Sequence, residues 1–117
     1  MLIGLAGFAL TGFAHFIGES PMPDKLLWFQ INPLQNVVHV LIGIGLLLGA
    51  AGGETASRVI VGFVSTVLVI VGIAGFLVID TEFNWLSLNI ADNFLHLGTA
   101  ILGFAAFASS RREAATY

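Results

Sequence analysis

The chain contains no cysteine among its 117 residues. It therefore forms no disulfide, and it offers no thiolate for a metal site, an iron–sulfur cluster or nucleophilic catalysis. Basic residues are also scarce, since four Lys and Arg stand against seven Asp and Glu and leave a formal net charge of −3. Nucleic-acid binding needs clustered basic side chains, so this composition argues against it.

Charged residues of either sign make up only 9 % of the sequence, against roughly 25 % in soluble proteins. They leave four uncharged stretches, at 1–18, 26–53, 59–79 and 93–110. Each stretch is about as long as the ~20 residues that a helix needs to cross a bilayer. A soluble protein of this size cannot bury a chain that is 57 % hydrophobic. The sequence therefore predicts an all-α integral membrane protein, a four-helix transmembrane bundle in a single domain over 1–117.

The breaks between the expected spans are marked by polar residues, proline and glycine. Two prolines and three charged residues at 18–25 are expected to end the first span. Asn32 is expected to cap the second helix, with Pro33 at its first position. A short polar turn is expected at 54–58, and the fourth helix is expected to begin near Asn89.

The basic residues predict an orientation. Arginines fall on one face of the expected bundle, and Lys25 is alone on the other. The arginines are Arg58, Arg111 and Arg112. The positive-inside rule then places this face and both termini in the cytoplasm, with Trp28 and Trp85 as anchors at the outer interface. The first stretch lacks the basic start of a signal peptide, so we expect a retained span in a bacterial inner membrane or a photosynthetic membrane.

An internal repeat is visible at an offset of 57 residues. Segments 28–39 and 85–96 share a Trp, two Asn and a His at identical spacing. The first and third spans echo each other at an offset of 60, which aligns Gly12 with Gly72. The sequence therefore predicts a duplicated transmembrane hairpin whose copies are related by an axis along the membrane normal. The two repeats cover about 1–53 and 57–110.

Each repeat carries an Asn-x-x-His element, within 32–39 and within 89–96, and a glycine-rich helix follows the first. Through these elements the chain resembles a family of small bacterial four-span membrane proteins catalogued as domain of unknown function 4383. The resemblance extends over nearly the whole chain. It implies the four-helix fold, and it implies no activity, because the family is named for the lack of one.

The repeated polar residues have a structural interpretation. Asn36 and His39 lie three residues apart on one helix face, as do Asn93 and His96. Small residues continue these faces, an arrangement by which membrane helices approach closely and hydrogen-bond. We expect these side chains to hold the second and fourth helices together. The residues expected at helix contacts are Asn36, His39, Asn93, His96, Gly43, Gly45, Gly49 and Gly103.

The histidines also allow a cofactor hypothesis. His39 and His96 are candidate axial ligands for a haem iron or a chlorophyll magnesium, with His15 as a weaker third candidate. No site for a bare metal ion is predicted. Ion transport is disfavoured because no charged residue lies in mid-membrane, and Asp80 and Asp92 are expected as acidic helix caps in water.

Two functional hypotheses follow. The serines are terminal or isolated, and none is placed to meet a histidine, so we expect no enzymatic activity. The first hypothesis is a structural or accessory subunit that packs in the lipid bilayer against other subunits of a larger membrane complex, such as one of electron transfer or photosynthesis. The alternative is a haem-binding or chlorophyll-binding membrane protein that uses His39 and His96.

Overall fold

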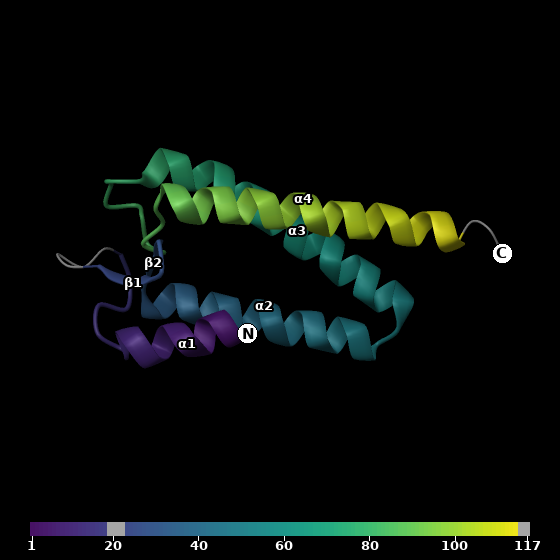
Figure 1. The fold of residues 1–117 in the computed structure, drawn as a ribbon, viewed down its shortest axis with the longest axis horizontal. Helices are drawn as coiled ribbons and strands as arrows, with labels where there is room; N and C mark the ends of the chain where they lie inside the picture. Colours follow the sequence, from purple (N-terminus) through teal and green to yellow (C-terminus); the bar gives the residue numbers. More distant parts are fainter. Residues whose placement is uncertain (19–22, 115–117) are drawn as a thin grey trace.

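The computed structural model describes residues 1–18 and 23–114, and side chains as far as Ser110. The elements are α1 (Leu2–Thr11), β1 (Asp24–Leu26), β2 (Phe29–Ile31), α2 (Pro33–Ala51), α3 (Glu54–Val78) and α4 (Ile90–Ala114) (Figure 1). Part of the predicted break at 18–25, namely residues 19–22, lies outside the described residues. So do the side chains of Arg111 and Arg112, which the orientation prediction used.

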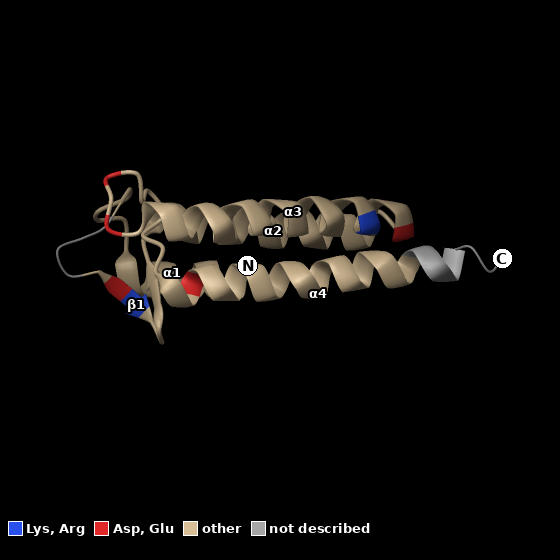
Figure 2. Cartoon of the chain, turned by 90° about the horizontal axis from the view of Figure 1, so that it is seen from above, with Lys and Arg blue, Asp and Glu red and all other residues tan. Residues whose placement is uncertain are grey.

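Three of the helices are long and apolar enough to cross a membrane. α2 has 19 residues, and α3 and α4 have 25 each. At 1.5 Å per residue they extend over roughly 28 to 37 Å, which matches a ~30 Å hydrocarbon core. Charged side chains gather at the two ends of the described molecule, and its middle carries none (Figure 2). The prediction of a helical membrane protein is confirmed at this level.

The first helix is shorter than predicted. α1 has ten residues and ends at Thr11, because Gly12 adopts a φ of 55° and turns the chain away. The expected continuation of the first span through residues 12–18 is therefore wrong. Met1 lies beside Gly43, halfway along α2, rather than level with the end of α4 (Figure 1).

The turn between α2 and α3 is also tighter than predicted. Residues 54–58, expected as a polar turn, form the first turn of α3, where the Ser57 N–H donates to the Gly53 carbonyl over 2.9 Å. Gly52 and Gly53 alone reverse the chain, and Gly53 does so with a φ of 90°. We call this end of the molecule, with Arg58, the arginine end.

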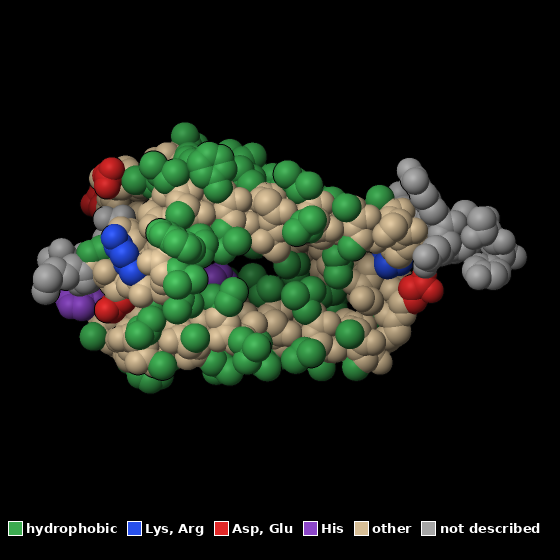
Figure 3. Space-filling view, in the orientation of Figure 1, with side chains coloured by type: hydrophobic (Ala, Val, Ile, Leu, Met, Phe, Trp, Pro, Cys, Tyr) green, Lys and Arg blue, Asp and Glu red, His purple; other side chains and the backbone are tan. Residues whose placement is uncertain are grey.

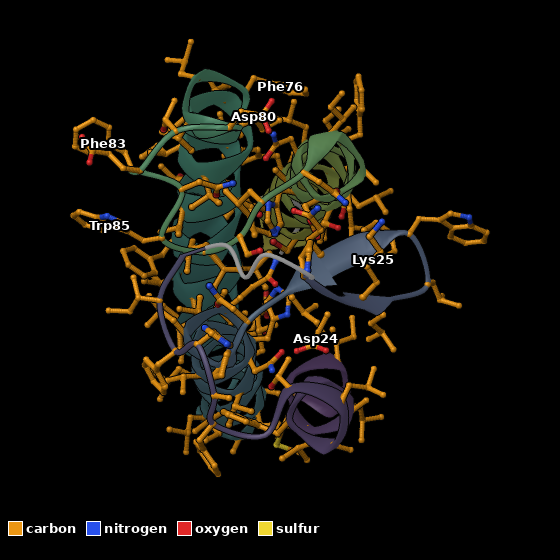
Figure 4. The ribbon with its side chains drawn as sticks, turned by 90° about the vertical axis from the view of Figure 1, so that its left-hand side faces the viewer. Asp24, Lys25, Phe76, Asp80, Phe83 and Trp85 are labelled. Carbon is orange, nitrogen blue, oxygen red and sulfur yellow. The ribbon has the colours of Figure 1, made fainter. Side chains whose placement is uncertain are left out.

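The opposite end, which we call the β end, comprises the β1–β2 hairpin and the loop between α3 and α4. The strands are antiparallel, and Leu26 pairs with Phe29 across the two-residue turn Leu27–Trp28. Trp28 is 74 % exposed and Trp85 is 59 % exposed. In the view onto this end, Phe83 and Trp85 project away from the helices (Figure 4). Both tryptophans therefore lie where interfacial anchors are expected.

The helices pack as two hairpins, α1 on α2 and α3 on α4. A contact between α2 and α3 joins the two hairpins. The contact of α3 with α2 includes Ile60 against Gly49 near the arginine end. Between α2 and the α3–α4 pair, the space-filling view is hollowed (Figure 3). Most of the buried side chains are polar, and they concentrate toward the β end, whereas large apolar side chains cover the outside.

Candidate functional site

Both helices that carry an Asn-x-x-His element begin at the predicted caps. The Asn32 Oδ1 accepts from the Gln35 N–H over 2.8 Å, and the Asn89 Oδ1 accepts from the Asp92 N–H over 2.9 Å. A capping side chain satisfies one of the backbone donors that a helix start leaves free. The prediction that Asn32 and Asn89 cap these helices is confirmed.

The same two asparagines connect the two halves of the chain. The Asn32 Nδ2 donates to the Trp85 carbonyl over 2.8 Å and to the Gly18 carbonyl over 3.1 Å. The Asn89 Nδ2 donates to the Trp28 carbonyl over 2.9 Å. Each cap therefore bonds to the backbone of the tryptophan in the other half, and the two bonds are reciprocal.

Asp92 completes one of the caps from a buried position. Its Oδ2 accepts from the Asn89 N–H over 3.1 Å, as in a capping box, and from the Gln30 N–H of β2 over 3.2 Å. The Asp92 side chain is only 2 % exposed, so the expectation of an acidic cap in water is wrong for Asp92. Asp80, in contrast, is exposed.

The asparagines of the Asn-x-x-His elements face the glycines of their own hairpins. Asn36 is fully buried against Gly7 of α1, and its Nδ2 donates to the Thr11 Oγ1 over 3.0 Å. Asn93 is fully buried against Gly75 of α3. These side chains hold α1 to α2 and α3 to α4, whereas the sequence interpretation placed them between α2 and α4.

The glycines in these contacts belong to a second sequence match that the offset of 60 missed. Residues 4–8 read Gly-Leu-Ala-Gly-Phe, and residues 72–76 read Gly-Ile-Ala-Gly-Phe, at an offset of 68. Gly4 lies against the Asn36 backbone as Gly72 lies against the Asn93 backbone. The geometry therefore aligns Gly4 with Gly72, whereas the offset of 60 aligned Gly12 with Gly72. The segment from Gly4 to Asn36 is eleven residues longer than the segment from Gly72 to Asn93, so the offset of 57 does not align these glycines.

His39 and His96 meet between α2 and α4. Their ring centroids are 6.2 Å apart, with an angle of 73° between the ring planes. The Nδ1 atoms of both rings are buried and have no hydrogen-bond partner among the described residues. Histidine surface is visible inside the hollow (Figure 3). His15 lies apart from the pair, exposed in the segment after α1.

The other predicted packing glycines contact different helices. Gly43 lies against Met1, Gly49 against Ile60 of α3, and Gly103 against Ser65 of α3. Nothing lies within 4 Å of a methyl group placed on Gly45, so Gly45 makes no close helix contact among the described residues. Among the described residues, no group of three or more His, Asp or Glu is arranged for a metal ion.

One face of α2, beside Met1 and the first turn of α1, is not covered by any other described residue. Here Met1, Leu2 and Ile3 border an apolar groove of about 530 Å³ with Gly43, Leu46 and Leu47 of α2. By the offset of 57, the equivalent positions of α4 begin with Ala100 and Gly103. α3 covers these two, since Ala100 has no exposed surface and Gly103 contacts Ser65. Among the described residues, α3 covers these positions of α4, and no helix covers the equivalent positions of α2.

Comparison with known proteins identifies a family and no individual relative. The family model described as "Domain of unknown function (DUF4383)" matches residues 1–109, which is most of the chain. No curated protein and no solved structure gives a significant match.

Proposed function

The chain belongs to the DUF4383 family of unknown function, and we propose that it is a non-catalytic membrane subunit that packs against a larger membrane assembly. In this proposal the arginine end faces the cytoplasm and the β end faces outward. The uncovered face of α2 receives a transmembrane helix of a partner subunit.

The observation that carries this proposal is the apolar groove on α2, which no described residue covers. The shared Gly-x-x-Gly-Phe segments, the paired asparagines and the reciprocal caps support a duplicated hairpin. In such a duplication α1 stands where the second half of α3 stands. At the offset of 68, α1 corresponds to residues 70–79, so among the described residues the part of α3 from Glu54 to Val69 has no counterpart on α2. A partner helix that lies there would complete the second hairpin interface.

The part of α3 that covers α4 indicates which kind of partner helix would fit the uncovered face of α2. α3 presents Val61 and Ser65 to Gly103 of α4, and Gly62 to Phe107. Small and β-branched residues at this spacing let two membrane helices approach closely. The partner helix is expected to run parallel to α1 and to offer a similar stripe to Gly43 and Leu47.

A cross-linking experiment tests this proposal. Because the chain has no cysteine, Leu47→Cys introduces a single thiol in the groove, to which a benzophenone maleimide is attached in native membranes. Leu48→Cys is the matched control, since Leu47 is 58 % and Leu48 is 65 % exposed but only Leu47 lines the groove. After irradiation, mass spectrometry is expected to find a peptide from a transmembrane helix of another protein joined to position 47 and not to position 48.

Two results would contradict the proposal. Cross-links to lipid alone at both positions would mean that the groove faces the bilayer. A cross-link from position 47 to a second copy of this chain would replace the larger assembly with a homo-oligomer.

The geometry of the histidine pair supports a second candidate function, the binding of a haem or chlorophyll. Bonds of about 2 Å from one metal to two imidazoles place the ring centroids roughly 6 Å apart. The separation of 6.2 Å between His39 and His96 has this magnitude. Two imidazoles from facing helices favour haem iron, which accepts axial ligands on both sides, over chlorophyll.

An absorbance spectrum tests the second candidate. Protein purified from its native membranes is expected to be coloured, and both His39→Leu and His96→Leu are expected to abolish the absorbance band. Phe104→Leu is the control, because Phe104 lies on α4 and is 40 % exposed. The expected result for this control is an unchanged spectrum. Colourless, folded wild-type protein from cells supplied with haem would contradict the haem hypothesis.

A further inference from the structure

A second polar site lies at the arginine end, far from the histidine pair. The first turns of α3 and the last described turn of α4 enclose a pocket of about 170 Å³. Glu54, Ser57, Arg58 and Ser110 line it together with Phe107. The functions proposed above do not use this pocket.

Arg58 is held in the pocket without a partner for one of its donors. Its guanidinium carbon lies 5.6 Å from the centroid of the Phe107 ring, a cation–π contact that fixes the side chain. The Nε atom is buried and has no hydrogen-bond partner among the described residues. A buried donor that is left unpaired destabilises a protein, so we expect this nitrogen to bind an acceptor from outside the described residues.

The start of α3 lies at the same end of the molecule as this pocket. The N-cap of α3 is Gly53, which has no side chain, so no side-chain cap satisfies the first backbone N–H groups of the helix. Free N–H groups and the helix dipole favour an anion at this place. Ser57 contributes a hydroxyl to the lining. The carboxylate of Glu54 opposes an anion, but Glu54 is exposed, so water screens its charge.

The position of the pocket narrows the choice of anion. It lies at the end of a membrane-spanning helix, at the level where the phosphates of a bilayer lie. Arg111 and Arg112 follow Ser110 in the sequence. Basic pockets between helices on the cytoplasmic side of a membrane are suited to lipid head groups.

We propose that the pocket between α3 and α4 at the arginine end binds the phosphate group of an anionic phospholipid, with Arg58 as its principal ligand. The guanidinium supplies a planar pair of N–H donors to two phosphate oxygens. The hydroxyl groups of Ser57 and Ser110, which also line the pocket, add donors to the guanidinium. The proposal is independent of the partner helix and of the histidine pair.

Native mass spectrometry of the full chain tests this proposal. The protein is released from nanodiscs of three parts phosphatidylcholine to one part phosphatidylglycerol, and the retained lipid is counted. Wild-type protein is expected to retain phosphatidylglycerol in preference to phosphatidylcholine, and Arg58→Gln is expected to reduce this preference about five- to tenfold. Lys25→Gln, which removes a cation at the β end, is expected to leave the preference unchanged.

Further arms separate the source of the phosphate and guard against misfolding. Inorganic phosphate and glycerol phosphate are offered in competition. Failure to displace the lipid supports a lipid site, and displacement by inorganic phosphate at equal concentration would overturn it. Ser57→Ala keeps the charge and removes one donor, so a smaller loss of preference is expected in a folded protein. An undiminished preference in both Arg58→Gln and Ser57→Ala would also overturn the proposal.

Discussion

Replacement of Gly75 with alanine is expected to lower the free energy of unfolding by roughly 1–3 kcal/mol, the usual cost of overpacking a close contact. A methyl group at this position would overlap the side chain of Asn93, which is fully buried and cannot move away. The change therefore pushes α3 away from α4 where Gly75 lies against Asn93. The measurement is a titration of the detergent-solubilised protein with sodium dodecyl sulfate, followed by circular dichroism.

Gly98→Ala is the matched control for this experiment. Gly98 also lies inside a long helix, but nothing lies within 4 Å of a methyl group placed on it. Both substitutions gain the same helix propensity, so the difference between the two variants measures the contact alone. Gly7→Ala, which would overlap Asn36, is expected to act in the same direction as Gly75→Ala. Equal stability of Gly75→Ala and Gly98→Ala would contradict the close contact.

Replacement of Asn32 with serine is expected to cost about 2–3 kcal/mol, because it leaves two carbonyls without their donor. Serine keeps an oxygen that can accept from the Gln35 N–H, so the helix cap survives. It loses the Nδ2 that bonds to Gly18 and to Trp85. The same titration measures the loss. Hydrogen exchange near Trp85 is expected to quicken as the β end loosens.

Asn32→Ala separates the two roles of this residue. Alanine removes the cap together with the two donated bonds, so it is expected to cost about 1 kcal/mol more than serine. If Asn32→Ser were as stable as the wild type, the bonds between the halves would contribute nothing, and only the cap would account for the asparagine.

The parts of the structure that were predictable are those fixed by neighbouring residues. The starts of α2 and α4 follow from Asn32 with Pro33 and from Asn89 with Asp92, since a cap acts within one turn. The long apolar stretches predict α3 equally well, because backbone groups in lipid must bond within their own helix.

Features that depend on distant contacts were not predictable. Hydropathy did not mark the end of α1 at Gly12, because the residues on both sides of it are apolar. The β1–β2 hairpin has strands of three residues, and its turn is Leu27–Trp28, where a two-residue turn usually shows Asn-Gly or Asp-Gly.

The sequence predicted which residues make up the candidate site, but it did not predict which helices the asparagine side chains face. The spacing placed each Asn and His on one helix face, and His39 and His96 do meet across the bundle. It could not show that Asn36 and Asn93 turn toward glycines of their own hairpins, because Gly7 and Gly75 lie in helices whose register the sequence left open. The burial of Asp92 depends on Gln30, a residue 62 positions away.

The arrangement of the bundle also determines the route by which anything could reach the histidines. At the β end the asparagine bonds join the segments at the starts of α2 and α4, and at the arginine end a tight turn joins α2 to α3 (Figure 1). The opening that remains faces sideways between the helices (Figure 3). In a membrane that opening meets hydrocarbon rather than water. A ligand that reaches His39 and His96 through this opening must therefore be soluble in lipid, which a hydrated ion is not.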